Sequence, residues 1–124
     1  MIVANANTLT IEEIKEAIDE AINNYEWPER VKRVGVFGSV ARGDTSKGSD
    51  LDLLLDFEYI ITNGDFEELD AEISKERALE NSLFKTFNPI SLSIVTVAGL
   101  EDNRGYADIA FKERVYKDVI WIYE

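Results

Sequence analysis

The sequence predicts an α/β fold, because segments with strand-like patterns alternate along the chain with segments of helical periodicity. Its 124 residues fit a single domain, which we expect to span residues 1–124. Hydrophobic residues make up 45% of the chain and charged residues 31%. This is the ordinary balance of a globular protein that can bury one hydrophobic core.

The first helix is expected to begin at residue 11, because Thr10 and Glu13 have the spacing of a capping box. Apolar residues then recur at steps of three and four, as in an amphipathic helix. They are Ile11, Ile14, Ile18, Ala21, Ile22 and Tyr25. Pro28 disfavours the helical conformation at Trp27, so the helix is expected to end there.

The next segment predicts two strands joined by a polar loop. Residues 31–37 are rich in β-branched side chains, and Gly38 is expected to end this strand. Residues 39–43 favour a turn of helix, 44–49 a loop and 50–57 a second strand. A period of two then divides the second strand into two faces. One face carries Leu51, Leu53, Leu55 and Phe57, and the other carries Asp50, Asp52, Leu54 and Asp56.

A long helix is predicted over residues 65–87, after a turn at 63–64 and before the break at 88–89. Its acidic first turn suits the helix dipole. Its expected apolar positions are Phe66, Leu69, Ile73, Ala78, Leu79, Leu83 and Phe84. The remaining elements are a strand over 90–97 that ends before Gly99, a helix over 102–114 and a closing strand over 119–123.

The composition excludes several classes of function. With 13 basic and 25 acidic residues, the net charge is −12, which disfavours binding to duplex nucleic acid or to an anionic membrane and suits a basic protein partner. The chain has neither cysteine nor histidine, so a metal site must use oxygen ligands and favours Mg²⁺, Mn²⁺ or Ca²⁺. No signal peptide or membrane-spanning run is visible, and we expect a cytoplasmic protein.

The candidate chemistry lies between residues 38 and 52. Asp50 and Asp52 are expected on one face of a strand, about 6–7 Å apart. Two carboxylates this close are costly unless a cation lies between them, which predicts a site for Mg²⁺ and a nucleotide. Gly38 lets the backbone approach phosphate, and the Ser39 hydroxyl adds a donor.

Two further side chains, Arg42 and Lys47, are candidate phosphate partners. Each feature also has a simpler explanation. An isolated pair of aspartates in an acidic chain is most often a solvated strand edge, an isolated Gly-Ser is usually a turn, and Arg42 could pair with Asp44. The joint spacing of the glycine–serine turn and the aspartate pair is what favours a site.

The sequence from Gly38 to Gly43, Gly-Ser-Val-Ala-Arg-Gly, is followed from Ser49 to Leu53 by Ser-Asp-Leu-Asp-Leu. This pattern resembles the signature of minimal nucleotidyltransferases of the polymerase-beta-like superfamily and matches it at every defined position. The order of the predicted elements also fits along nearly the whole chain. The resemblance implies a small mixed sheet flanked by helices.

The resemblance also implies the transfer of a nucleoside monophosphate from a nucleoside triphosphate, commonly ATP, to an acceptor hydroxyl. Gly38 and Ser39 would hold the triphosphate, with Arg42 and Ser49 as further nucleotide-binding candidates. Asp50 and Asp52 would be the catalytic, metal-binding pair for Mg²⁺ or Mn²⁺. Members of this family often act as the antitoxin of a toxin–antitoxin pair and bind a HEPN-type toxin.

The sequence departs from the family pattern at the third carboxylate, which usually lies on the third strand. Ser93 occupies the matching position, and Ser91 is the alternative register. Asp56 lies about 13 Å beyond Asp52 along the strand, too far to replace this group. Glu101 or Asp102 could reach the site only by a loop movement that nothing in the sequence supports.

Three functions therefore remain open. The chain could be an active nucleotidyltransferase, or an impaired relative that neutralises a partner by contact. A sugar- or drug-modifying enzyme is the third, although such enzymes need a further substrate-binding domain. The sequence does not identify the acceptor or the oligomeric state, and a homo-oligomer is one of the states that it allows.

Overall fold

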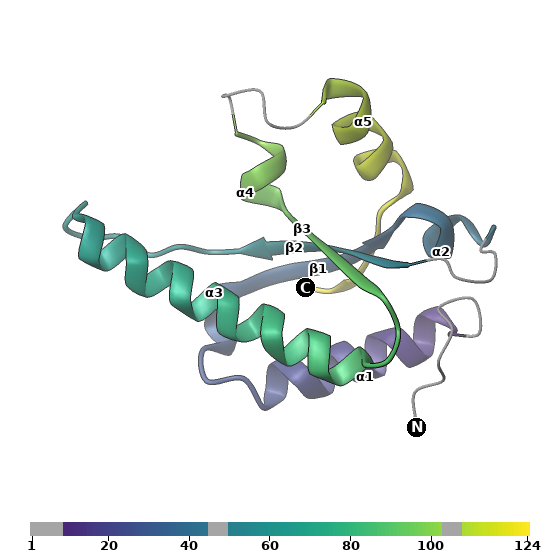
Figure 1. The fold of residues 1–124 in the computed structure, drawn as a ribbon, viewed down its shortest axis with the longest axis horizontal. Helices are drawn as coiled ribbons and strands as arrows, with labels where there is room; N and C mark the ends of the chain where they lie inside the picture. Colours follow the sequence, from purple (N-terminus) through teal and green to yellow (C-terminus); the bar gives the residue numbers. More distant parts are fainter. Residues whose placement is uncertain (1–8, 45–49, 103–107) are drawn as a thin grey trace.

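The computed structural model describes residues 9–44, 50–102 and 108–124, which form a four-stranded mixed sheet flanked by helices (Figure 1). The strands lie in the order β3-β2-β1-β4. They are β1 (Val31–Phe37), β2 (Leu51–Phe57), β3 (Leu92–Thr96) and β4 (Ile120–Tyr123). Strand β1 runs antiparallel to β2 and β4, whereas β2 and β3 are parallel. The predicted fold class is confirmed.

Helices cover both faces of this sheet (Figure 1). Helix α1 (Ile11–Asn23) and helix α3 (Phe66–Phe87) pack on one face, and α4 (Val97–Leu100) and α5 (Ile109–Asp118) lie on the other. The short helix α2 (Gly38–Arg42) follows β1 directly. Among the described residues, no helix has the combination of length and apolar character needed to cross a membrane.

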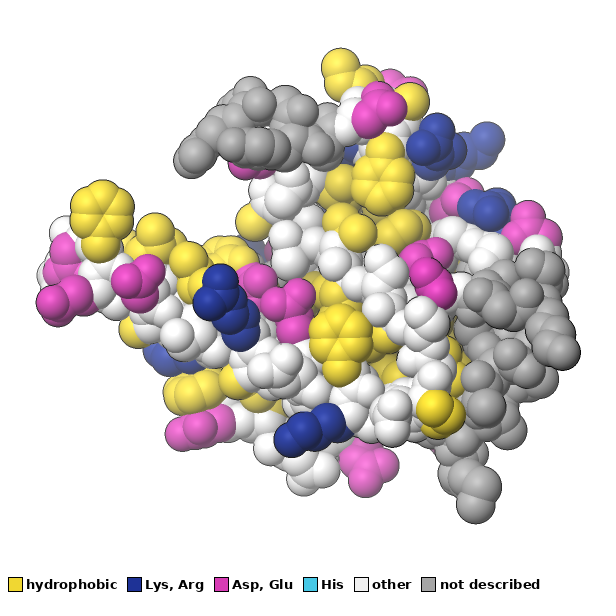
Figure 2. All heavy atoms as spheres, in the orientation of Figure 1, with side chains coloured by type: hydrophobic (Ala, Val, Ile, Leu, Met, Phe, Trp, Pro, Cys, Tyr) yellow, Lys and Arg dark blue, Asp and Glu magenta, His cyan; other side chains and the backbone are white. Residues whose placement is uncertain are grey.

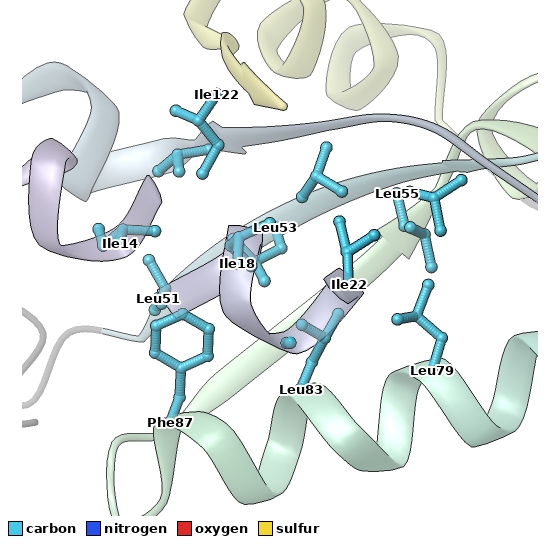
Figure 3. Close-up of a cluster of buried hydrophobic side chains, with 14 of the residues drawn as sticks. Ile14, Ile18, Ile22, Leu51, Leu53, Leu55, Leu79, Leu83, Phe87 and Ile122 are labelled. Carbon is cyan, nitrogen blue, oxygen red and sulfur yellow. The ribbon is translucent and has the colours of Figure 1, made fainter. Parts of the chain in front are cut away.

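Strand β2 contributes to the hydrophobic core on both faces. Leu51, Leu53 and Leu55 face α1 and α3, while Leu54 belongs to the second cluster beneath α4 and α5. All four leucines are fully buried. Figure 3 shows the first cluster, in which side chains of α1 and α3 converge on the leucines of β2. The helix residues are Ile14, Ile18, Ile22, Leu79, Leu83 and Phe87. The period-two division of β2 is therefore confirmed.

Local hydrogen bonds define where the two long helices begin. In α1 the Glu13 amide donates to Thr10 Oγ1 at 3.1 Å, and the Thr10 amide donates to Glu13 Oε1 at 3.0 Å, which completes the predicted capping box. In α3 the Glu68 amide donates to Asp65 Oδ1 at 2.8 Å. Helix α1 ends at Asn23, four residues before the predicted end at Trp27.

The prediction was less accurate after residue 90. Strand β3 begins at Leu92, two residues later than expected. It ends at Thr96, which caps the helical turn α4 by accepting from the Gly99 amide at 3.0 Å. Helix α5 begins after Asp108 and continues to Asp118, beyond the predicted end at Arg114. Residues 103–107 of the predicted helix lie outside the described residues.

Three apolar positions of α3 were also predicted wrongly. Phe66, Ala78 and Phe84 lie on the exposed surface of the helix, and Phe66 is 85% exposed. In contrast, Leu79 and Leu83 are in the core as expected, together with Phe87 at the end of the helix. The buried stripe of α3 is therefore narrower than its apolar pattern.

Helix α3 also buries one fully paired glutamate. Glu72 is 2% exposed and accepts from Arg30 Nε at 2.8 Å, Lys75 Nζ at 2.7 Å and the Ile60 amide at 2.7 Å. The hydrogen bond from Arg30 is the main reason that the pKa of Glu72 falls to about 2. The Glu72 carboxylate therefore joins α3 to the segment before β1, which holds Arg30, and to the segment after β2, which holds Ile60.

The next turn of α3 carries a glutamate pair without comparable partners. Glu76 Oε2 is buried and has no hydrogen-bond partner among the described residues. Burial, followed by the negative charge of Glu80, raises the pKa of Glu76 to about 7. Burial also raises the pKa of Glu80. The ionised pair is therefore a destabilising feature at neutral pH.

The raised pKa of Glu76 predicts how stability depends on pH. Because its pKa rises from 4.5 to about 7 on folding, its contribution to stability is fully present below pH 4.5 and is lost as the pH rises through 7. In the wild type, we expect the free energy of unfolding to fall by on the order of 1 kcal/mol as the pH rises through 7, a value reduced for partial exposure. We expect Glu76→Gln to remove this fall. Urea unfolding at pH 4.5 and pH 8 measures this difference.

The matched control is Glu113→Gln, which makes the same charge change at an exposed position of α5. We expect Glu113→Gln to keep the pH dependence of the wild type. If Glu76→Gln also keeps it, Glu76 does not titrate in the neutral range.

Candidate functional site

The two halves of the sequence motif meet where β1 ends. Phe37 and Asp52 are paired across β1 and β2, and the next residue, Gly38, has a φ of +73°. A Cβ atom at Gly38 would clash with Asp52 Oδ2. Only glycine therefore allows both this backbone conformation and this close approach. The start of α2 is held directly against the Asp52 carboxylate.

The two aspartates occupy different environments. Asp50 is exposed just before β2, whereas Asp52 is partly buried on the face of β2 opposite Leu51 and Leu53. Burial, then the charge of Asp50, raises the pKa of Asp52, and Arg42 opposes this effect. The two carboxylates repel each other, and one of them is partly desolvated. A hard divalent cation would offset both costs, so this pair of oxygen donors fits such an ion.

Ser93 lies directly beside Asp52, because the two residues are partners in the parallel pairing of β2 and β3. The predicted placement of the third strand is therefore confirmed, and a serine occupies the position next to the metal-binding candidate. Within 9–44, 50–102 and 108–124, no group of three or more acidic side chains could hold a metal ion. The structure thus offers the aspartate pair without a third carboxylate among these residues.

A cavity of about 230 Å³ opens beside Asp52 and Ser93. It lies between the sheet and α5, and its apolar wall includes Phe111 and Val115. Two charged residues of α5, Arg114 and Asp118, also line it. Sequence reasoning missed both, because the helix was expected to end at Arg114 and nothing in the local pattern connects α5 with the motif.

Arg42 is held between two carboxylates at this cavity. Its Nε donates to Asp44 Oδ2 at 3.1 Å, and its Nη1 donates to Asp118 Oδ2 at 2.7 Å. The alternative pairing of Arg42 with Asp44 is therefore present, and Asp118 adds a second partner. The hydrogen bond that Arg42 donates to Asp118 is the largest of the effects that raise the pKa of Arg42. This places a permanent positive charge close to Asp52.

The other acidic candidates are engaged elsewhere. Asp56 pairs with Arg33 at 3.0 Å, and Glu101 pairs with Lys112 at 2.8 Å and accepts from the Tyr116 hydroxyl at 2.9 Å. Ser39 is partly buried in the first turn of α2. The remaining candidates, Lys47 and Ser49, lie outside the described residues.

Residues 11–117 match the family model of the nucleotidyltransferase domain. The chain belongs to the nucleotidyltransferase domain family. This membership implies, in general, a nucleoside triphosphate substrate and a divalent metal. The match includes the glycine–serine turn, the aspartate pair and the β3 position of Ser93 within its bounds.

Two curated relatives resemble part of the chain. It is 42% identical over 64 residues to protein adenylyltransferase MntA of Thermococcus cleftensis, which covers 50% of this chain and 63% of the relative. It is 40% identical over 52 residues to the provisionally named protein adenylyltransferase MJ0604 of Methanocaldococcus jannaschii, covering 39% and 50%. Both alignments span less than two thirds of the relative's length.

A solved structure extends the likeness over the whole fold. A protein provisionally described as a minimal nucleotidyltransferase has a TM-score of 0.56 and 25% sequence identity, with 90% of this chain and 95% of that chain covered. The mixed sheet and its flanking helices are therefore those of a minimal nucleotidyltransferase.

The contact between Gly38 and Asp52 predicts the effect of Gly38→Ala. An alanine there is strained by the positive φ, at a cost of about 1–2 kcal/mol, and its Cβ also displaces the Asp52 carboxylate. We expect this variant to lose more stability in urea unfolding than Gly64→Ala. Gly64 has a similar φ of +70° but has no atom within 4 Å of the added Cβ. Equal losses would show that the Asp52 contact is unimportant.

Proposed function

We propose that this protein transfers a nucleoside monophosphate, most simply AMP from ATP, to a hydroxyl group on a partner protein. The observation that carries the proposal is the close contact of Gly38 with the Asp52 carboxylate, which joins a phosphate-binding turn to a metal-binding pair. Family membership supports nucleotidyl transfer. The two curated relatives, both named as protein adenylyltransferases, support a protein acceptor.

In this proposal the acceptor hydroxyl oxygen forms a bond to the α-phosphorus while the bond to the leaving pyrophosphate breaks. Asp50 and Asp52 would hold Mg²⁺ or Mn²⁺, which would neutralise the phosphate charge. Gly38 and Ser39 would hold the triphosphate through backbone and hydroxyl donors. Arg42 and Ser49 would complete the nucleotide contacts, and Arg42 is already positioned at the cavity.

Ser93 determines how efficient this reaction can be. A serine hydroxyl is a weak metal ligand and cannot act as a general base at neutral pH. The acceptor hydroxyl is therefore poorly activated beside Asp52, and slow transfer follows. The same observation favours a second candidate function, a binding module that neutralises its partner by contact.

We further propose that the partner is a HEPN-type toxin and that this chain is its antitoxin. The net charge of −12 suits a basic, RNA-cleaving partner and disfavours direct binding of duplex nucleic acid. Both candidate functions use this partner. They differ in whether a covalent bond is formed.

Label transfer separates the two functions. The protein is incubated with Mg²⁺, radiolabelled ATP and the protein encoded beside it, and the products are resolved by gel electrophoresis. We expect label on the partner with the wild type and none with Asp50→Ala/Asp52→Ala, because the double variant lacks both carboxylates. Tight partner binding without label from either form would instead support the binding module.

A second variant tests the position of Ser93. We expect Ser93→Asp to bind Mn²⁺ at least tenfold more tightly and to transfer label faster, because it adds a third carboxylate next to Asp52. Without metal, the same variant should unfold at lower temperature, since three like charges then repel. Ser91→Asp is the matched control, because Ser91 is exposed and just precedes β3. Equal behaviour of the two variants would show that Ser93 is not at the metal site.

A further inference from the structure

A second surface of the protein lies on α3, on the face of the sheet opposite Asp52. One side of this helix packs in the core through Leu79, Leu83 and Phe87, but a neighbouring stripe does not. With 3.6 residues per turn, the stripe has a helical spacing of three and four along one flank. It consists of Phe66, Leu69, Ile73, Glu76, Glu80 and Phe84. We call these residues the α3 flank.

The α3 flank is apolar at its ends and accessible to a partner. Phe66 is 85% exposed and Phe84 is 45% exposed, while Leu69 and Ile73 are partly exposed. Figure 2 shows hydrophobic side chains along α3 that are interrupted by acidic and basic ones. The flank is about 27 Å long, from the rise of 1.5 Å per residue, and this length and straight shape match those of another helix.

The centre of the α3 flank has an unsatisfied acceptor. Glu76 Oε2 is buried without a hydrogen-bond partner among the described residues, and Glu80 faces it with the same charge. One turn earlier, Glu72 has Arg30, Lys75 and a backbone amide as partners. Glu72 therefore has two cations as direct partners, Arg30 and Lys75. The charge of Arg77 lowers the pKa of both Glu76 and Glu80 without offsetting their burial, and Glu76 Oε2 has no hydrogen-bond partner in the described part of the chain.

We propose that the α3 flank is a docking surface for an amphipathic helix of a partner protein, one that carries an arginine or lysine between apolar residues. The apolar side chains would cover Phe66, Ile73 and Phe84, and the cation would pair with Glu76 and Glu80. A second copy of this chain does not fit, because it would bring another glutamate pair against the first. The surface does not depend on nucleotidyl transfer, since Asp52 lies on the other face of the sheet.

The test uses fluorescein-labelled helical peptides of defined sequence. One peptide has a leucine stripe with a central arginine, and its match has glutamate in place of the arginine. By fluorescence anisotropy, we expect the arginine peptide to bind at least tenfold more tightly. Glu76→Gln/Glu80→Gln should abolish this preference, and Phe84→Ala should weaken the binding of the arginine peptide by several fold.

The matched control is Glu16→Gln/Glu20→Gln, which removes an exposed pair with the same spacing from α1. Both double variants replace two glutamates with glutamines, so a general attraction of the acidic chain for arginine would be weakened by the α1 variant as well. We expect the α1 variant to keep the tenfold preference, and amide chemical shifts to change along α3. Equal binding of the two peptides, a preference that survives Glu76→Gln/Glu80→Gln, or shifts confined to other elements would overturn the proposal.

Discussion

Strand β2 is buried on both faces, and this constraint determines where the candidate site lies. Leu51, Leu53 and Leu55 fill the core beneath α1 and α3, and Leu54 fills the core beneath α4 and α5. A slip of one residue would move these leucines to the wrong faces and carry Asp52 into the larger core, at a prohibitive cost for a charge. Burial of the leucines therefore determines on which face of the sheet the Asp52 side chain lies.

The same register brings three parts of the chain together at Asp52. Gly38 approaches the carboxylate from the end of β1, Ser93 lies beside it on β3, and Arg42 provides the nearby positive charge. Backbone placement determines the first two contacts, whereas the Arg42 guanidinium is held by hydrogen bonds to Asp44 and Asp118. A site built in this way is well suited to holding a nucleotide and metal in place, which is most of what phosphoryl-type transfer requires. The serine beside Asp52 separates this positioning from activation of the acceptor.

The fold could be predicted from local patterns wherever burial follows the periodicity of the sequence. The capping box of α1 and the two faces of β2 are of this kind, whereas the position of Ser93 beside Asp52 was predicted from the family resemblance. The predictions were wrong where a local cap ends a strand and where an apolar side chain stays on the surface. Thr96 caps α4 and shortens β3, and Phe66 and Phe84 are apolar without being buried. The contribution of Asp118 to the cavity could not be predicted, because it depends on how α5 packs against α2.

The parallel pairing of β2 with β3 also affects the order in which the protein can fold. Antiparallel β1 and β2 are close in sequence, but Asp52 and Ser93 become neighbours only after the whole of α3 has crossed between their strands. Closing so long a connection is entropically costly and is a slow step compared with forming a helix or a nearby strand pair. During synthesis, a growing chain therefore has the glycine turn and the aspartates in place before the strand that completes their surroundings. The half of the site that the proposed function assigns to the nucleotide can form early, whereas the side that it assigns to the acceptor is among the last parts to assemble.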